Sequence, residues 1–425
     1  MLELLKKLVE YNISIWLDGD NLELSFGEEA PDEMLIDSLR ENKPEIISFL
    51  KERKVFSALA FNNLTDLKRI PLSFAQERLL FIELLEKGSS AYHIPYFARL
   101  NAEADLVVLE KAINLIVDRH PVLKTVYHND ERGNFQQVLD SQIAMSSQKF
   151  EHQDEVWNHV RTEINTPFDL KNEPCLKVFN YESGNEQFML FLFHHIAFDG
   201  WSMNIFLTEL SSVYISLSNE EKPQLPELGI SYADYAIWQQ DYLQGENFER
   251  LKTYWQKNLS GYETLNIPLD YRRPDQFDYL GKDYVFEFTA ELSAGLRKLA
   301  REKETTLNSV LLSAYYMLLA IVSGQKDILI GIASDNRAQA QIQALIGFFV
   351  NTLPLRVQVS AEQGVDRLID QVHEALTEVK LHQDLPFEKL IDELKIERDI
   401  SRHPLFQVLF SFEDFQGEDD NELPL

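Results

Sequence analysis

The stretch Gln187-Phe-Met-Leu-Phe-Leu-Phe-His-His-Ile-Ala-Phe-Asp-Gly-Trp-Ser carries the most structural information in this chain. After Gln187 its first part is continuously apolar, and such a run predicts a strand buried on both faces. His194 and His195 follow at the end of that strand. Asp199 comes next, and Gly200 allows the chain to turn tightly there. The stretch therefore predicts a buried strand that leads directly into a polar loop.

The two adjacent histidines fit proton transfer better than metal binding. Adjacent strand residues point to opposite faces of a sheet, so both rings rarely reach one ion. The sequence has no second cluster of histidine, cysteine and carboxylate residues with ligand spacing, and we expect no metal site. We expect one imidazole to face a cleft, where it can move a proton near neutral pH, and the other to pack into the wall. Asp199 is expected to hold the loop through a backbone hydrogen bond or an arginine.

Helical and strand patterns alternate on both sides of this stretch. Apolar residues fall on one face of a predicted helix from Asp105 to Arg119, and a long apolar helix is predicted from Leu307 to Ile321. The strand Asp327-Ile-Leu-Ile-Gly-Ile follows that second helix. This alternation predicts an α/β or α+β core.

The N-terminal part of the chain is predicted to be a small unit of its own. A helix over residues 2–9 precedes a β-hairpin made of Ile13–Leu17 and Leu22–Phe26, and further helices begin at Pro31 and Pro44. A unit this small can leave a strand edge open, and an open edge can capture an extended peptide.

Composition and charge exclude several classes of partner. The net charge of −29 argues against nucleic acid and anionic membrane surfaces as partners. No run of about 18 uncharged apolar residues predicts a membrane span, and the N-terminus lacks a signal-peptide pattern. Cys175, the single cysteine, excludes an intramolecular disulfide and indicates a reducing, cytoplasmic compartment. We expect Cys175 to be a packed residue rather than a nucleophile.

Seven ordered motifs resemble those of the condensation domains of non-ribosomal peptide synthetases. The signature of that family is His-His-x-x-x-Asp-Gly, found here at His194–Gly200. The other motifs are Leu72-Ser-Phe-Ala-Gln-Glu-Arg-Leu-Leu-Phe, Arg119-His-Pro-Val-Leu-Lys-Thr, Tyr232-Ala-Asp-Tyr-Ala-Ile-Trp-Gln, Ile330-Gly-Ile-Ala-Ser-Asp-Asn-Arg with Ile346-Gly-Phe-Phe-Val-Asn-Thr-Leu, His382-Gln-Asp-Leu-Pro-Phe-Glu and Arg398-Asp-Ile-Ser-Arg-His-Pro-Leu-Phe-Gln-Val. The resemblance covers residues 70–412, and Lys124 departs from it where arginine is usual.

The resemblance implies a mixed α/β fold of two chloramphenicol acetyltransferase-like lobes, related as a pseudo-dimer. We expect a docking domain at residues 1–54, a linker at 55–69, the first lobe at 70–245 and the second at 246–425. The N-terminal unit is similar to megasynthase docking domains, which capture the C-terminal tail of an upstream subunit. The hairpin residues expected to carry this docking are Ile15, Trp16, Leu17, Leu22 and Leu24. An adenylation domain is expected to follow in the full-length protein.

The resemblance also implies an acyl transferase that forms an amide bond. A donor acyl or peptidyl thioester would react with the amine of an acceptor aminoacyl thioester, both carried on 4'-phosphopantetheine by upstream and downstream carrier proteins, with no cofactor bound by the domain itself. His195 would remove a proton from the amine or orient it, and both roles stay open. His194 and Asp199 belong to the same expected catalytic motif, and the N–H of Gly200 is a candidate donor to the oxyanion.

Four further residues are expected to support the tunnel between the lobes: Arg119, Asn351, Ser73 and Trp201. In relatives the residue that matches Asp199 forms a salt bridge with an arginine, and Arg119 is the expected partner here. Asn351 is expected to form a hydrogen bond near the tunnel, and Trp201 to pack.

Two alternatives remain beside the condensation reaction. An epimerisation domain shares the His-His-x-x-x-Asp-Gly signature, although it is not expected to carry the motifs at His382 and Arg398 in this form. A non-catalytic platform that recruits partner proteins usually has a disrupted histidine, and both histidines are intact here. The donor is a peptidyl, fatty acyl or polyketide group, and the sequence does not distinguish among these.

Overall fold

The computed structural model describes residues 14–18, 21–25, 36, 38–40, 42–52, 69–85, 88–101, 103–274, 281–337, 339–360, 362–396, 402–413 and 423. The chain divides into two compact units. Unit 1 comprises Met1–Tyr242, Arg337–Phe349 and Gln416–Leu425, and unit 2 comprises Leu243–Asn336 and Val350–Phe415.

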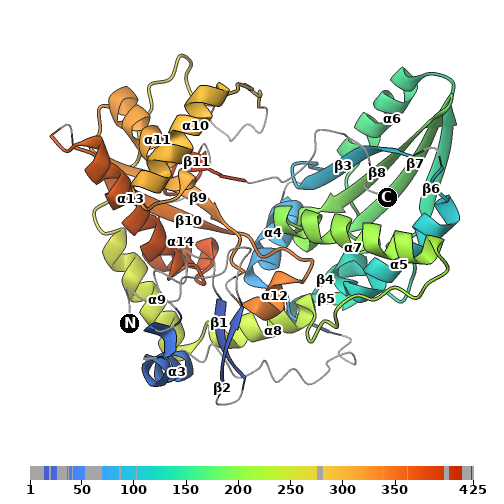
Figure 1. Cartoon of the computed structure of the whole chain (residues 1–425), viewed down its shortest axis with the longest axis horizontal. Helices are drawn as coiled ribbons and strands as arrows, with labels where there is room; N and C mark the ends of the chain where they lie inside the picture. Colours follow the sequence, from blue (N-terminus) through green and yellow to red (C-terminus); the bar gives the residue numbers. More distant parts are fainter. Residues whose placement is uncertain are drawn as a thin grey trace. The chain divides into compact units, whose positions relative to one another are not determined.

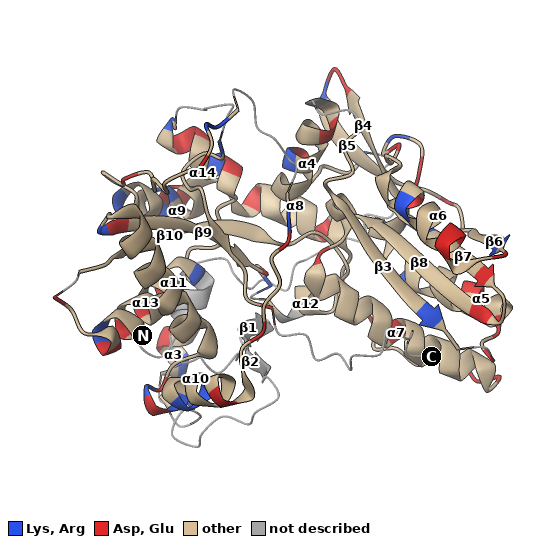
Figure 2. Cartoon of the chain, turned by 90° about the horizontal axis from the view of Figure 1, so that it is seen from above, with Lys and Arg blue, Asp and Glu red and all other residues tan. Residues whose placement is uncertain are grey.

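Unit 1 is built on a four-stranded mixed sheet (Figure 1). In spatial order its strands are β3 (His93–Leu100), β8 (Glu186–His194), β7 (Leu176–Ser183) and β6 (Met145–Phe150). β8 is antiparallel to both neighbours, whereas β6 and β7 are parallel. Every residue of β8 from Phe188 onward is buried, which confirms the predicted buried strand. The central strands are almost free of charged side chains (Figure 2).

The other elements of unit 1 surround this sheet. They are α4 (Phe74–Leu85), α5 (Leu106–Arg119), η1 (Pro121–Lys124), the hairpin β4 (Thr125–Asp130) and β5 (Gly133–Val138), α6 (Gln153–Asn165), η2 (His195–Ala197), α7 (Gly200–Ser218) and α8 (Tyr232–Tyr242). The predicted helix at Asp105–Arg119 is confirmed as α5, and Asp105 caps it by accepting from the backbone N–H groups of Val107 and Val108. α5 packs against α7, and the two run side by side (Figure 1).

An aromatic cluster anchors α7 to the end of β8. The Phe193 ring stacks on Phe198 with centroids 3.7 Å apart and meets Phe206 edge-on at 5.1 Å. All three side chains are fully buried. Burial of a phenylalanine side chain contributes about 1.5–3 kcal/mol, so this cluster fixes the turn between β8 and α7 firmly.

Unit 2 contains a three-stranded sheet in the order β10 (Asn351–Gln358), β9 (Asp327–Ser334) and β11 (Leu409–Phe410). Its helices are α9 (Gly245–Asn258), α10 (Ala290–Glu302), α11 (Leu307–Ser323), α13 (Val365–Lys380) and α14 (Phe387–Leu394). The predicted apolar helix from Leu307 and the predicted strand from Asp327 are both confirmed. α13 packs on α11 and on β10.

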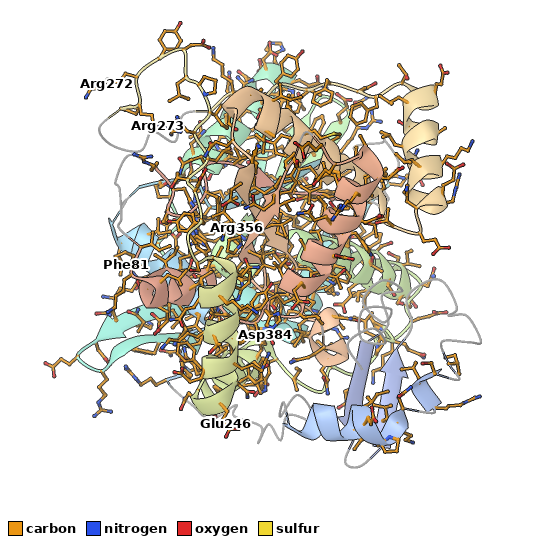
Figure 3. The ribbon with its side chains drawn as sticks, turned by 90° about the vertical axis from the view of Figure 1, so that its left-hand side faces the viewer. Phe81, Glu246, Arg272, Arg273, Arg356 and Asp384 are labelled. Carbon is orange, nitrogen blue, oxygen red and sulfur yellow. The ribbon has the colours of Figure 1, made fainter. Side chains whose placement is uncertain are left out.

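Arg356 ties the strands of unit 2 to the end of α9. Its guanidinium donates to both carboxylate oxygens of Asp327, at 2.6–3.1 Å, and to the backbone carbonyls of Asn258, Ser260 and Gly261, at 2.8–3.0 Å. Arg356 therefore lies at the end of α9 opposite Glu246 (Figure 3). A planar fork with five donors suits this task better than a lysine ammonium would.

The second lobe, predicted as the continuous range 246–425, differs from the observed grouping. Arg337–Phe349, between β9 and β10, groups with unit 1 and contains the short helix α12 (Ala340–Gln343). Leu423 also groups with unit 1. The reason for the first exception is polar: Arg337 and Phe349 bind the buried carboxylate of Asp199.

The predicted N-terminal hairpin is confirmed. β1 (Ser14–Asp18) and β2 (Asn21–Ser25) pair antiparallel, with Ile15 opposite Leu24 and Leu17 opposite Leu22. The helix predicted to begin at Pro44 is confirmed as α3 (Lys43–Glu52). The helix predicted over residues 2–9 and most of the 55–69 linker lie outside the described residues, as do the side chains of Ile15, Trp16, Leu17 and Leu24. The side chain of Leu22 is half-buried.

No single described helix is long and apolar enough to cross a membrane. α10 and α11 together would be long and apolar enough, but the two helices are bent by 107° relative to each other.

Candidate active site around His195

His195 occupies the first position of η2, directly after β8. Its Nδ1 lies 2.6 Å from the carbonyl oxygen of Phe198. A carbonyl oxygen only accepts, so Nδ1 carries the hydrogen and Nε2 keeps its lone pair. Among the described residues, the hydrogen bond to Phe198 is the only one that the ring forms, and it leaves Nε2 unused. This ring is therefore held in the tautomer of a proton acceptor.

The surroundings of His195 keep it neutral. Burial lowers the pKa of His195 below its ordinary value, and the hydrogen bond to Phe198 and the charge of Asp199 oppose that effect only in part. The ring lies 4.5 Å from that of Phe348, centroid to centroid. The backbone N–H of His195 donates to the carbonyl oxygen of Tyr92 at 2.8 Å. The half-buried imidazole is thus neutral near pH 7 and has little freedom to turn.

Asp199 is fully buried and caps α7. Its Oδ1 accepts from the N–H and hydroxyl of Ser202 at 2.8 and 2.7 Å, and its Oδ2 accepts from the N–H of Phe349 at 3.1 Å. Arg337 donates to both carboxylate oxygens, at 3.0 and 3.2 Å. The predicted role of Asp199 in holding the loop is confirmed, but the expected partner Arg119 is wrong and the partner is Arg337.

Arg119 instead belongs to a second polar cluster between α5 and α7. It donates to Glu209 at 3.0 Å and to the carbonyl of Pro226. The neighbouring His120 binds the other Glu209 oxygen at 2.9 Å, and its Nδ1 accepts from the N–H of Ile346 at 3.3 Å. The Arg-His pair of this motif therefore joins α5, α7 and the Arg337–Phe349 segment within unit 1.

Gly200 is the first residue of α7 and is exposed. A Cβ atom added at Gly200 would meet no atom within 4 Å, so the space beside its backbone is open. The first N–H groups of a helix have no partner within the helix and can bind a negatively charged oxygen, and Asp199 occupies that of Ser202 here. The site therefore offers both space and a donor next to the imidazole loop.

Ser73 and Trp201, two of the expected supporting residues, form hydrogen bonds with groups other than His195. Ser73 is buried, and its hydroxyl lies 2.8 Å from that of Tyr232, which donates to the carbonyl of Phe348 at 2.6 Å. Ser73 thus supports the segment that carries Phe348. Trp201, predicted to pack, has 41% of its surface exposed, and its indole N–H donates to the carbonyl of Gln343 at 2.9 Å.

Asn351 lies in unit 2, and its side-chain amide forms hydrogen bonds with backbone groups of the same unit. Its amide nitrogen donates to the carbonyls of Gln383 and Leu385 at 2.7 and 2.8 Å, and its oxygen accepts from the N–H of Phe387 at 3.2 Å. The expected hydrogen bonding is present, but all three partners belong to unit 2, and a place near the tunnel stays a prediction. Because both amide hydrogens are used, Asn351 holds the turn before α14 in place.

His194, grouped with the catalytic residues in the sequence analysis, is fully buried. Its Nδ1 accepts from the N–H of Ile196 at 3.1 Å, and its Nε2 lies 3.3 Å from a carboxylate oxygen of Glu83. Both ring nitrogens are occupied, so His194 is the histidine that packs into the wall. Among the described residues, no group of three or more metal-ligating side chains forms a metal site.

Comparison with known proteins matches both parts of the chain. The family described as "Condensation domain" matches residues 67–424, and the family described as "TubC N-terminal docking domain" matches residues 2–52. The chain belongs to the condensation-domain family. It is a condensation domain with an N-terminal docking domain, as the resemblance implied.

The condensation domain is similar to segments of much longer synthetases. It is 40% identical to one of the linear gramicidin synthase subunits of Brevibacillus parabrevis over 358 residues, which are 82% of this chain and 7% of that protein. It is 33% identical to one of the plipastatin synthase subunits of Bacillus subtilis (strain 168), over 82% of this chain and 14% of that protein. The chain thus spans a small part of the length of these relatives.

Solved structures share the fold of the condensation domain. The X-domain from teicoplanin biosynthesis aligns with a TM-score of 0.73 and 25% identity, over 81% of this chain and 77% of that one. The four-domain nonribosomal peptide synthetase AB3403, bound to AMP and glycine, aligns with a TM-score of 0.72 and 26% identity, over 83% of this chain and 27% of that one. The predicted mixed α/β, chloramphenicol acetyltransferase-like fold is confirmed.

Sequence reasoning missed several residues that shape this site: Gln76, Glu83, Ser202, Arg337 and Phe348. Arg337 ends the recognised motif from Ile330, so its motif position was a usable signal. The glycine at position 347, in the motif from Ile346, was a second usable signal. The structure shows why it is glycine: a Cβ there would lie 2.0 Å from the Tyr232 ring. For Glu83 the helical spacing alone contained no sign of its partner.

Proposed function

We propose that this condensation domain joins a donor acyl or peptidyl thioester to the amine of an acceptor aminoacyl thioester, each carried on the phosphopantetheine of a carrier protein. The observation that carries the proposal is the neutral, half-buried His195, whose Nδ1–H is bound to the Phe198 carbonyl. That bond leaves Nε2 as the acceptor, and the space beside Gly200, five residues further along the chain, is open.

The chemistry requires little from the protein beyond positioning and a proton acceptor. The amine nitrogen attacks the thioester carbonyl carbon, the C–S bond breaks, and the departing thiolate takes up the proton that the amine loses. Because a thioester is already activated, holding both arms in register can supply much of the rate. Nε2 of His195 either removes the amine proton or orients the amine, and a lowered pKa favours the neutral form in both roles.

Gly200 would contribute space and charge stabilisation. With no side chain there, the donor arm can approach the backbone closely. The carbonyl oxygen becomes negative during the attack, and the start of α7 favours a negative charge. Asp199 and Arg337 do not contact substrate in this scheme, and they keep the helix start and the Phe348 segment together.

We propose further that the N-terminal hairpin binds the C-terminal tail of an upstream synthetase subunit. Among the residues that the structure describes, β1 and β2 pair only with each other, and a strand with one neighbour keeps a backbone edge available for strand addition. The donor would then arrive on a carrier protein of a separate subunit, and the acceptor on a downstream carrier.

A carrier-to-carrier assay tests the main proposal. Donor and acceptor carriers loaded with a panel of acyl and aminoacyl groups are mixed with the wild type or with His195→Ala, and the amide product is measured by mass spectrometry. We expect product from the wild type and a loss of at least about tenfold in the variant. His128→Ala is a matched control, because within the described part of the chain the His128 ring packs against Phe135 in the β4–β5 hairpin and forms no hydrogen bond. Equal product from both proteins would remove His195 from the mechanism.

A non-catalytic platform is the second candidate, and the likeness to the X-domain from teicoplanin biosynthesis favours it. A complex of that X-domain with OxyB, also from teicoplanin biosynthesis, is among the similar structures. If neither the wild type nor the variant makes amide from any donor of the panel, this candidate replaces the enzyme.

A further inference from the structure

The helix α4 braces the loop that carries His195 at two points. Gln76 and Glu83 are seven residues apart in α4, so they lie on the same face of the helix. Gln76 donates to the carbonyl of Ile196 at 3.4 Å, and Glu83 binds Nε2 of His194 at 3.3 Å. Both contacts reach η2 or the residue immediately before it, and α4 packs directly against η2.

Ile196 and Glu83 together fix the tautomer and the position of the His194 ring. The N–H of Ile196 donates to Nδ1 of His194, so this nitrogen must be unprotonated. The hydrogen of the neutral ring then sits on Nε2, where the carboxylate of Glu83 accepts it. Burial lowers the pKa of His194, which keeps the ring neutral.

The His194 ring is buried between two other rings. His93 lies opposite it in the β3–β8 register, with ring centroids 5.9 Å apart, and Phe168 lies at 5.5 Å. Without an acceptor at Glu83, a buried Nε2–H would have no partner, which is unfavourable. Ile196 still requires an unprotonated Nδ1, so the ring can reach a new partner for Nε2–H only by tilting. A tilt would weaken the hydrogen bond from Ile196 and release η2.

We propose that Glu83 is a positioning residue that holds His195 in place through His194. This inference rests on the proposed condensation reaction for its effect on rate, but its structural part is independent of activity. Glu83 touches no substrate. It keeps His194 as an acceptor for the N–H of Ile196, and so fixes the η2 turn from which His195 presents Nε2.

The test compares Glu83→Ala with Glu83→Gln and with Glu77→Ala. Gln keeps an acceptor oxygen for Nε2–H, whereas Ala removes it. Glu77 also lies on α4, but its carboxylate binds Asn134 in the β4–β5 hairpin. We expect Glu83→Ala to lower kcat at least about tenfold with little change in KM, and the other two to stay within about threefold of the wild type. Thermal unfolding establishes that each variant is folded.

A spectroscopic readout separates this inference from the reaction. In ¹⁵N-histidine-labelled protein, His194 and His195 are assigned by their loss in single variants. The wild type should show opposite tautomers, with the hydrogen on Nε2 of His194 and on Nδ1 of His195. Glu83→Ala should shift or broaden the ring ¹⁵N signals of both His194 and His195, because neither ring is then held in place. Unchanged signals of both rings would overturn the inference, even if the wild type makes no amide and the proposed function fails.

A double-mutant cycle completes the design. The oxygen of asparagine in His194→Asn can replace Nδ1 as the acceptor for Ile196, but its amide N–H₂ is too short to take the place of Nε2 beside Glu83. Glu83→Ala should therefore change the rate and the His195 signals far less in this background than in the wild type. Equal effects in both backgrounds would show that Glu83 does not act through His194. If Glu83→Ala unfolds the protein, Glu83→Gln and His194→Asn still test the inference. The tautomer of His194 in Glu83→Gln must match that of the wild type.

Discussion

Asp199 and Arg337 are 138 residues apart in the sequence, yet their side chains form a buried ion pair with an N–O distance of 3.0 Å. The pair joins the start of α7, just after His195, to the segment between β9 and β10. The guanidinium also lies 4.0 Å from the ring centroid of Phe349. Removing one partner of such a pair leaves a charge buried without compensation, which is costly.

Arg337→Ala should therefore destabilise unit 1 by about 3–5 kcal/mol, measured as a fall in the midpoint of urea unfolding. Arg337→Lys should be destabilising too, because a lysine cannot donate to both carboxylate oxygens. Arg69→Ala is the control, since the Arg69–Asp130 pair is partly exposed and should matter far less. Similar small shifts for Arg337→Ala and Arg69→Ala would contradict the importance of the buried pair.

Gly347→Ala should destabilise the protein by about 1–3 kcal/mol. The new Cβ would lie 2.0 Å from the Tyr232 ring, which is fully buried and cannot move away easily. Gly229→Ala is a matched control, because a Cβ there meets no atom within 4 Å. Thermal unfolding of both variants checks the expectation, and equal melting temperatures would show that Tyr232 adapts.

Gly200→Ala should behave in the opposite way, with normal stability and low activity. The added methyl meets no atom within 4 Å and alanine suits a helix, so the melting temperature should stay within a few degrees of the wild type. The same methyl would occupy the space proposed for the donor arm, and we expect amide formation to fall at least about tenfold. A fully active Gly200→Ala protein would place the donor elsewhere.

Stability should fall as the pH drops below about 6.5, the ordinary pKa of histidine. Burial lowers the pKa of His93, His194 and His195 in the folded protein. Between those lowered values and 6.5 the unfolded chain binds more protons than the folded one, so the histidine contribution is complete above this window and is lost through it. Urea midpoints at pH 7.5, 6.5 and 5.5 measure the effect.

His195→Ala provides the internal comparison for this pH dependence. It removes one of the three groups, so its urea midpoint should depend less steeply on pH than that of the wild type. If the wild-type midpoint does not change between pH 7.5 and 5.5, the buried histidines do not control stability in this range.

Much of the local structure could be predicted because local patterns encode it. The apolar run before His194 predicted β8, and Asp105 followed by helical spacing predicted α5 with its cap. The alternation around Asp18 predicted the β1–β2 hairpin. In each case hydrogen bonds between near neighbours and the burial of one face determine the element.

Residue patterns along the chain were enough to predict the strand, the turn after it and two histidines with different expected roles. Contacts between distant parts of the chain were needed to show that His195 keeps Nε2 as its acceptor, that His194 binds Glu83, and that Asp199 pairs with Arg337 rather than Arg119. The physical reason is that spacing specifies neighbours along one element, whereas the path of the whole chain decides which distant side chain reaches a buried charge. Arg119 forms its ion pair with Glu209 on α7, whereas Arg337, at the start of the Arg337–Phe349 segment, pairs with Asp199.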